Sequence, residues 1–366
     1  MAAKPAAVLA PALPEAKPQT IEINIAYGTE KKKWLLAAIE KFHGTLGERP
    51  ITINPIGLGS VEGAHAILDG PGPTPIHVWS PASSAYRDVF ESEWRIKHDQ
   101  SPIVEEANLA LTPMVFVMWK ERHEAFVKKY KEVSFETIGR AMREPGGWAT
   151  IADKPIWGFF KFGHTHPNKS NSGLLTLVLM AYEFTGKVSN LSLADITQPA
   201  FQSWLQAFER GVSRPVGSLT HSTGTLMEEM VLRGPSQYDC LVVYENLAID
   251  YMAAALQHWG DLHVVYPARS MWNEHPYYIL DVPWSDVDHR EAARTFLKFL
   301  MSEPIQRGAL DHGFRPGDPS IPVRFPESPL VKNEKYGLMI EVPTMCSPPK
   351  AEVLRNLLGS FLRIER

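Results

Sequence analysis

Five short segments rich in hydroxyl and amide side chains stand where an expected strand gives way to an expected helix. They are Tyr27–Thr29, Gly57–Ser60, Ser80–Ser84, Asn168–Gly173 and Ser222–Thr225. The first turn of a helix carries unpaired N–H groups and a partial positive charge, and Ser and Thr hydroxyls add further donors. Each segment alone is also what an ordinary helix N-cap looks like. Together, and divided between two halves of the chain, they predict a ligand cleft lined with hydrogen-bond donors.

An alternation of expected strands and helices positions these segments. Strand patterns at Ile21–Tyr27, Ile51–Ile56 and Ile76–Trp79 each precede a helical pattern, and the alternation recurs in the middle of the chain. Such alternation is typical of an α/β layer with a largely parallel sheet, in which ligands bind beyond the carboxyl ends of the strands. We expect the apolar segments Leu109–Trp119 and Tyr277–Pro283 to cross between two lobes.

The overall composition limits the classes of protein to which the chain can belong. Its 366 residues are enough for several domains or for one large two-lobed body. Lysine and arginine number 37 against 41 acidic residues, and the net charge of −4 disfavours a protein that coats nucleic acid. We therefore expect no nucleic-acid partner. In addition, no apolar run approaches the ~20 residues that a membrane helix needs.

Two features bear on where the protein acts. Residues 1–20 are rich in Ala and Pro, which predicts a flexible leader, and they lack the basic start of a signal peptide. The cysteines, Cys240 and Cys346, are too few for a disulfide framework or a cysteine-based zinc cluster. The sequence leaves open whether these cysteines pair. It also leaves open whether a signal was removed or the protein is cytoplasmic.

Motifs of common enzyme classes are missing. The glycines of Gly57–Gly63 lack the spacing of a dinucleotide-binding loop, and no P-loop, zincin, nucleophile-elbow or CxxC motif occurs. We therefore expect a protein that binds rather than catalyses and that carries no cofactor. One enzymatic alternative stays open, in which His164 and His166 hold a metal ion together with Glu245. Loop histidines that only make hydrogen bonds are the simpler interpretation.

Four stretches in a fixed order resemble a known family. They are residues 76–90, 162–187, 234–249 and 275–316. In these the chain resembles the type II periplasmic binding proteins, specifically the bacterial extracellular solute-binding group that includes molybdate-binding proteins. The likeness runs from about Ile21 to the C-terminal helix. The chain is also similar to proteins in which such a domain accompanies a von Willebrand factor type A module.

The resemblance implies two α/β lobes joined by a hinge, which close on a small solute in the cleft between them. We expect a leader at 1–20, lobe 1 at 21–114 and 282–366, and lobe 2 at 115–281. The matching positions of the family, together with the hydroxyl-rich turns, give the expected ligand-binding residues: Thr29, Ser60, Ser80, Ser83, Asn171, Ser172, Gly173, Thr223, Tyr244 and Glu245.

The charged residues near these positions leave the solute's identity open. Glu30 and Glu245, if both face the cleft, favour a cation, an amine or a polyol such as a sugar, whereas Lys31–Lys33 would attract an oxyanion. The resemblance implies a monomer in the periplasm or outside the cell that hands its solute to an ABC-type permease or a signalling partner. A receptor or scaffold module that works with a von Willebrand type A protein is the other alternative.

Overall fold

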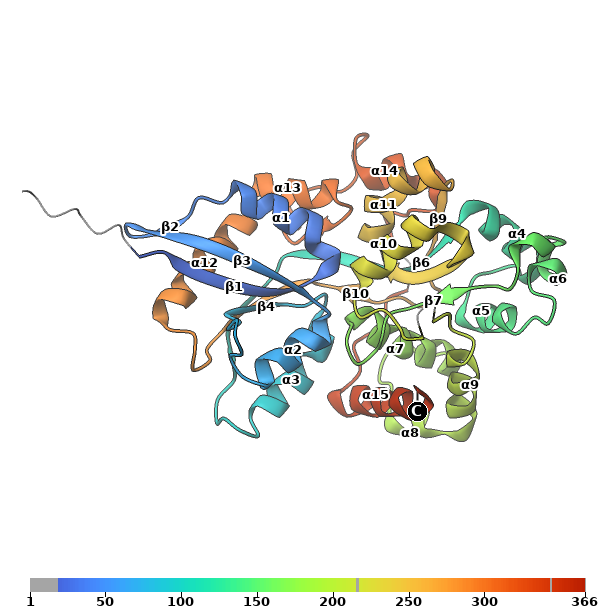
Figure 1. Ribbon diagram of the computed structural model, residues 1–366, viewed down its shortest axis with the longest axis horizontal. Coiled ribbons are helices and arrows are strands. Elements are labelled where there is room, and N and C mark those ends of the chain that lie inside the picture. Colours follow the sequence, from blue (N-terminus) through green and yellow to red (C-terminus); the bar gives the residue numbers. More distant parts are fainter. Residues whose placement is uncertain (1–18, 215–216, 343, 366) are drawn as a thin grey trace, which may run out of the picture.

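Two separate mixed sheets, each covered by helices, form two lobes (Figure 1). The computed structural model describes residues 19–214, 217–342 and 344–365. Most of the expected leader therefore lies outside the described residues. Lobe 1 contains the blue and orange segments at the left of Figure 1, and lobe 2 contains the green and yellow segments at the right. Within the described residues, no helix is long and apolar enough to cross a bilayer.

The sheet of lobe 1 has the order β2-β3-β1-β4-β11-β5. Its strands are β1 (Ile21–Gly28), β2 (Thr45–Leu46), β3 (Arg49–Leu58), β4 (Val78–Ser80), β5 (Ile103–Asn108) and β11 (Pro276–Leu280). Strands β3, β1 and β4 are parallel, so their carboxyl ends meet at one edge of the sheet. Alternate side chains point to opposite faces, as Val78 and Trp79 do, and each face packs on its own apolar cluster.

Five helices cover the two faces of this sheet. They are α1 (Lys32–Lys41), α2 (Ser60–Leu68), α3 (Arg87–Trp94), α12 (Val287–Leu300) and α13 (Glu303–Asp311). The apolar side chains of α1, α12 and α13 share the cluster of Val78, and those of α2 and α3 share the cluster of Trp79. Because α2 follows β3 directly, its first turn lies at the sheet edge where the parallel strands end.

The central strand of lobe 2 is β6 (Ala110–Trp119). It pairs with β8 (Cys240–Tyr244) on one side and with β9 (Leu262–Val265) on the other. Short strands β7 (Phe162–Gly163), β10 (Trp272–Asn273) and β12 (Arg315–Pro316) extend this sheet.

The helices of lobe 2 are α4 (Lys120–Tyr130), α5 (Phe135–Met142), α6 (Trp148–Ala152), α7 (Asn171–Thr185), α8 (Leu193–Thr197), α9 (Pro199–Glu209), α10 (Thr223–Arg233) and α11 (Glu245–His258). Helix α7 is apolar on all sides, and its residues from Asn171 to Tyr182 are all buried. A helix with this pattern belongs in the interior, so α7 holds its N-terminal polar residues in a fixed position.

The chain crosses between the lobes at three neighbouring places, near Leu109, His275 and Phe314. The Leu109 N–H donates to the His275 carbonyl at 3.1 Å, and the Gly317 N–H donates to the Leu109 carbonyl at 3.2 Å. Strand β6 starts just after the first crossing and runs unbroken through Pro113, which faces Trp272 of β10. The crossings therefore lie side by side and form the hinge between the lobes.

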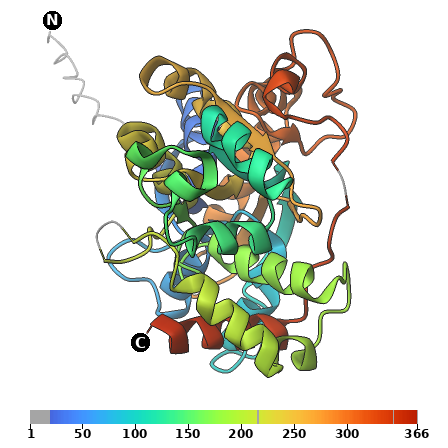
Figure 2. The same cartoon turned by 90° about the vertical axis from the view of Figure 1, so that its right-hand side faces the viewer.

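The expected lobe boundaries need three corrections. Strand β6 belongs to lobe 2 from Ala110 on, so lobe 1 ends near Leu109 rather than at residue 114. Strand β11 lies inside the sheet of lobe 1, so the return to lobe 1 comes at His275 rather than at residue 282. The whole of 282–366 was expected in lobe 1, but after the third crossing β12 pairs with β6 of lobe 2. The last helix, α15 (Ala351–Glu365), packs mainly against α7, α8 and α9 of lobe 2 and also touches α3 of lobe 1. Figure 2 shows this red helix beside the yellow-green helices α8 and α9. Burial of its apolar side, which includes Leu354 and Phe361, explains this placement.

Candidate functional site

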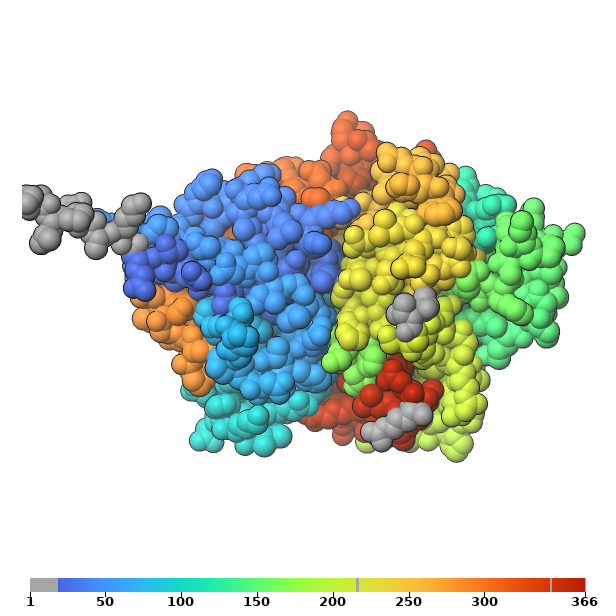
Figure 3. Space-filling view, in the orientation of Figure 1, coloured from blue at the N-terminus to red at the C-terminus, as the bar shows by residue number. Residues whose placement is uncertain are grey.

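The lobes meet at the first turn of α2. The N–H groups of Val61 and Glu62 donate to the carbonyl oxygen of Lys169 in lobe 2 at 3.1 and 3.0 Å. On the same turn, the hydroxyl oxygen of Ser60 accepts a bond from the Ala82 N–H at 3.0 Å, which ties α2 to the loop after β4. In Figure 3 the blue lobe and the yellow lobe meet along one seam. The structure is thus a closed arrangement of the lobes.

Asn171, the first residue of α7, connects the lobes through its side chain. The Ser83 hydroxyl of lobe 1 donates to its Oδ1 at 2.7 Å. Its Nδ2 donates to the hydroxyl of Tyr244 at 3.0 Å and to Oδ1 of Asn273 at 2.9 Å. All four side chains are buried. Asn171 therefore brings together a lobe 1 loop, strand β8 and strand β10.

A cluster of buried hydroxyls lies beside Asn171. The Ser172 oxygen is 2.7 Å from the hydroxyl oxygens of both Thr165 and Thr223, and Ser170 lies 3.3 Å from Thr223. These residues come from the loop after β7 and from the starts of α7 and α10, so two helix beginnings converge here. Burial raises the pKa of the neighbouring Tyr244 hydroxyl, which stays protonated. The cluster offers neutral donors and acceptors.

Thr29 forms another contact between the lobes. Its hydroxyl oxygen accepts a bond from the Gly224 N–H in the first turn of α10 at 3.2 Å. Asn246 of α11 donates through Nδ2 to the Glu30 carbonyl at 3.1 Å. The short helix η1 (Thr29–Lys31), which follows β1, is therefore held from lobe 2 at two points.

Glu30, Lys31 and His275 form a buried charged group on the lobe 1 side. Lys31 Nζ lies 2.7 Å from Glu30 Oε1, donates to the Pro81 carbonyl at 3.1 Å and lies 3.4 Å from His275 Nδ1. Burial alone would raise the pKa of Glu30, but the Lys31 ammonium and the nearby His275 hold it at about 2. Burial, with Lys31 nearby, lowers the pKa of His275 to about 4. The charges of Glu30 and Lys31 therefore cancel, and the imidazole is neutral at pH 7.

Two predicted site residues have less direct roles in this arrangement. Ser80, at the end of β4, is buried, and its hydroxyl has no hydrogen-bond partner among the described residues. A Cβ at Gly173 would lie 2.2 Å from the Thr165 carbonyl, so glycine is needed there for packing within lobe 2.

The structure places Glu245 away from the other predicted site residues. Its carboxylate forms an ion pair with Arg315, with distances of 3.1 and 2.8 Å, and a hydrogen bond with the Tyr266 hydroxyl. Burial raises the pKa of Glu245, and Arg315 acts against this rise. The carboxylates of Glu30 and Glu245 therefore do not both face the cleft, because that of Glu245 is paired with Arg315, just after the third crossing.

The two loop histidines do not share a site with Glu245. His164 Nε2 lies 3.1 Å from buried Glu209, and His166 Nε2 lies 3.2 Å from Glu365 of α15. Among the described residues, no group of three or more His, Cys, Asp or Glu side chains could hold a metal ion. The contacts of His164 and His166 thus support the interpretation of these histidines as hydrogen-bonding residues. Separately, both cysteines, Cys240 and Cys346, are free and buried.

Several residues near the expected site were missed from the sequence. Thr165 belongs to the hydroxyl cluster, and Asn273 is bonded to Asn171. Asn246 and His275 contact the Glu30–Lys31 turn. None of the four was among the expected ligand-binding residues. Thr165 stands beside the His164-x-His166 pair, and its hydroxyl could have been noticed there. Asn246 directly follows the predicted residues Tyr244 and Glu245 and could have been noticed there as well. Asn273 and His275 carry no local signal, because their positions depend on the second crossing and on the pairing of β10 with β6.

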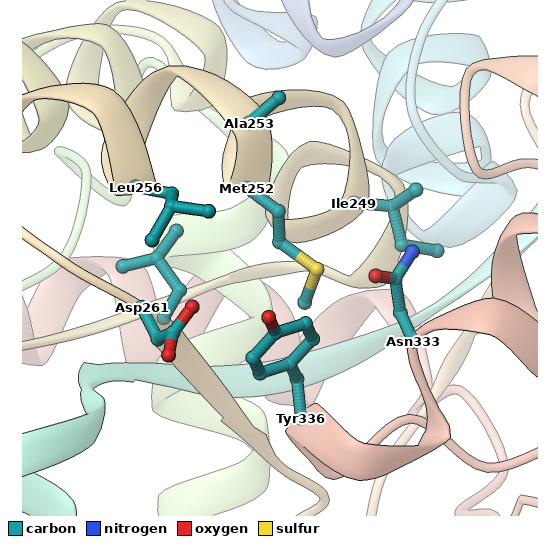
Figure 4. Close-up of a pocket in the computed structure, with 8 residues that line it drawn as sticks. Ile249, Met252, Ala253, Leu256, Asp261, Asn333 and Tyr336 are labelled. Atoms are coloured by element: carbon teal, nitrogen blue, oxygen red, sulfur yellow. The ribbon is translucent and has the colours of Figure 1, made fainter.

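Two hollows involve residues of α11. One, of about 260 Å³, is lined from both lobes, by Thr29, Lys33 and Leu36 on one side and by Gly224 and Tyr251 on the other, among others. The second, of about 210 Å³, belongs to lobe 2, where apolar side chains of α11 face the segment with Asn333 and Tyr336 (Figure 4). Of these two hollows, only the first is lined by an expected ligand-binding residue, Thr29.

The fold and the site define a two-lobed binding protein, and the comparisons agree. Residues 23–315 match the family described as bacterial extracellular solute-binding protein, and the chain belongs to that family of binding proteins rather than enzymes. The architecture is that of the type II periplasmic binding proteins, as the resemblance predicted. A comparison with curated proteins finds no match.

Solved structures share this architecture at low sequence identity. A periplasmic thiamin binding protein aligns with a TM-score of 0.62 at 12% identity, covering 98% of this chain and 100% of that one. The sulfate-binding protein SubI from Mycobacterium tuberculosis aligns with a TM-score of 0.57 at 15% identity, covering 92% and 96%. At these identities the likeness shows the fold alone.

Proposed function

We propose that this chain captures a small polar solute between its lobes by hinge closure and delivers it to an ABC-type transporter, acting in the periplasm or outside the cell. The observation that carries this proposal is the convergence of polar groups from both lobes on one buried region, with Ser83 bonded to Asn171 and Thr29 bonded to Gly224. A solute that touches both sides shifts the equilibrium between the open and closed arrangements.

The proposed binding residues follow from these contacts. Lobe 1 supplies the hydroxyls of Thr29, Ser60 and Ser83, together with the buried hydroxyl of Ser80. Lobe 2 supplies the side chains of the cluster, namely Asn171, Ser172, Thr223 and Tyr244. Gly173 has a packing role. Glu245 is not among the proposed binding residues, because its carboxylate is paired with Arg315.

The charges of the site favour a solute recognised through hydrogen bonds. Glu30 and Lys31 neutralise each other, and the rest of the cluster consists of hydroxyls and amides. A solute with several oxygen or nitrogen atoms can satisfy such groups whether or not it carries a charge. The solved relatives include proteins named for sulfate and for thiamin, so this fold holds solutes of very different size.

A thermal-shift screen tests the proposal. Separate panels of oxyanions, divalent cations, sugars and amines are added to the purified protein, and the melting temperature is followed. A ligand that binds only the folded form stabilises it by about 2.7 kcal/mol when present at 100 times its Kd. We expect a concentration-dependent rise with one panel. If no compound of the four classes raises the melting temperature, the proposal is wrong.

A further inference from the structure

The contact between the lobes at α2 is made by backbone atoms. The N–H groups of Val61 and Glu62 belong to the first turn of the helix and have no acceptor within it. The carbonyl oxygen of Lys169, from the other lobe, accepts both bonds. Lobe 2 therefore supplies the acceptor that a lobe 1 helix lacks, and this bond exists only while the lobes are closed.

Gly59, the residue before α2, allows this approach. A Cβ at this position would lie 2.3 Å from the Lys169 carbonyl oxygen and 2.6 Å from that of His221, both in lobe 2. The backbone of Gly59, with φ −62° and ψ 145°, is open to any residue, so its own conformation does not require glycine. Only the distance between the lobes requires a residue without a side chain.

Gly224, in lobe 2, likewise allows close approach to the backbone of lobe 1. A Cβ there would lie 2.7 Å from the Thr29 carbonyl oxygen and 2.9 Å from the Thr29 hydroxyl oxygen. Gly224 is the second residue of α10, where a helix by itself would prefer alanine. Gly59 and Gly224 thus each face the backbone of the opposite lobe.

Further polar contacts support the same closed arrangement. The ammonium group of Lys33 lies 3.4 Å from the Asp250 carboxylate, and His312 of lobe 1 also lies 3.0 Å from that carboxylate. With the bond between Ser83 and Asn171, polar groups of each lobe are satisfied by partners in the other lobe.

We propose that the lobes close through these direct contacts without a solute bridging them, and that Gly59 and Gly224 are the residues that permit closure. This inference concerns the equilibrium between the open and closed arrangements. It does not depend on which solute the cleft binds, or on whether the proposed function is right.

Hydrogen exchange of the solute-free protein tests the proposal. The Val61 and Glu62 amides have no partner in α2, so their protection reports the Lys169 contact directly. We expect both amides to be protected in the unmodified chain and to lose that protection in Gly59→Ala, with an increase in the radius of gyration measured by X-ray scattering. Gly224→Ala, in the other lobe, should give the same two changes.

The matched control is Gly308→Ala, because Gly308 lies in helix α13 and a Cβ there meets nothing within 4 Å. It should leave both measurements unchanged. Circular dichroism and the melting temperature distinguish an opened protein from an unfolded one. Fast exchange of Val61 and Glu62 in the unmodified chain would overturn the proposal. So would a Gly59→Ala protein that keeps their protection and its radius of gyration.

Discussion

The ammonium nitrogen of Lys31 lies 2.7 Å from Oε1 of Glu30, and the two side chains are 0% and 3% exposed. These neighbours on one short helical turn form a closed ion pair beneath the cleft. The run Lys31–Lys33 looks in the sequence like one basic surface, but only Lys32 and Lys33 are exposed. The attraction of anions by this run is thus limited to two charges at the cleft edge, one of which is paired with Asp250.

Replacing Lys31 with methionine tests this pair. The change leaves the Glu30 carboxylate buried without its cation, and removal of one partner from a buried pair costs about 3–5 kcal/mol. We expect Lys31→Met to lower the free energy of unfolding by that amount in urea denaturation. The exposed neighbour provides the control, since Lys32→Met should change stability by less than about 0.5 kcal/mol. Equal effects of the two substitutions would contradict the burial of Lys31.

The pH dependence of stability follows from the same group. The pKa of His275 is about 4 in the folded protein against 6.5 ordinarily, so the unfolded chain binds more protons between these values. The folded state therefore loses stability as the pH falls from 6.5 towards 4, by up to about 3 kcal/mol. The Glu30 pKa of about 2 against 4.5 adds a second loss, which begins as the pH falls below 4.5.

Urea unfolding at pH 7, 5.5, 4.5, 4 and 3.5 measures this dependence. We expect His275→Gln, which cannot titrate, to show a smaller loss of stability between pH 6.5 and 4 than the unmodified chain. Its loss below pH 4.5 should remain, because Glu30 is still present. Identical curves for both proteins throughout that range would show that His275 is not the titrating group.

The hydroxyl cluster predicts a binding defect without unfolding. Ser172→Ala combined with Tyr244→Phe removes two buried hydroxyls, and we expect a loss of about 1 kcal/mol of stability for each. The affinity for the solute found by thermal shift, measured by calorimetry, should fall at least tenfold. Tyr277→Phe is the control, because it removes a buried hydroxyl bonded to Ala293 in lobe 1, and it should leave affinity unchanged. Unchanged affinity in the double variant would contradict the assigned site.

Glu245→Gln should separate stability from binding. The substitution leaves the Arg315 guanidinium without its carboxylate, so the free energy of unfolding should fall by about 3–5 kcal/mol. Because Glu245 faces Arg315 and Tyr266, calorimetry on the folded variant should show the affinity of the unmodified chain. A specific loss of affinity would instead place this carboxylate at the solute.

The assignment of α15 to lobe 2 is open to a similar test. Phe361 is fully buried and lies edge-on to His166, with ring centres 5.2 Å apart. Phe361→Ala leaves a cavity and should cost about 3–5 kcal/mol. In hydrogen exchange, the resulting loss of protection should concentrate in α7 and α9. Loss confined to the sheet of lobe 1 would contradict the placement.

Lobe 1 was largely predictable from the sequence because its strands and helices alternate in order and carry their own patterns. The alternation of β1 and the break at Gly28 mark a strand, and the apolar spacing after it marks a helix. The hydroxyl-rich turns could be predicted for the same reason, since a helix start has a local signature. The convergence of these turns on one region was also predicted, but it depends on how the two lobes fold and meet rather than on any local signature.

The remaining features depend on distant contacts. Lys31 and His275 are 244 positions apart, and nothing near Lys31 distinguishes its burial from the exposure of Lys32. Glu245 follows Tyr244 directly, yet it begins α11 and turns to Arg315, which is 70 positions away. The tail was misplaced because an amphipathic helix indicates which side is buried but not which lobe covers it.

The three crossings near Leu109, His275 and Phe314 limit how the lobes can move. Hydrogen bonds join neighbouring backbone at the first two crossings, so sliding of one lobe along the other would break them. Rotation about an axis through the crossings leaves these bonds in place. The motion then has one principal degree of freedom, and a single distance between labels on α1 and α11 would describe the whole transition.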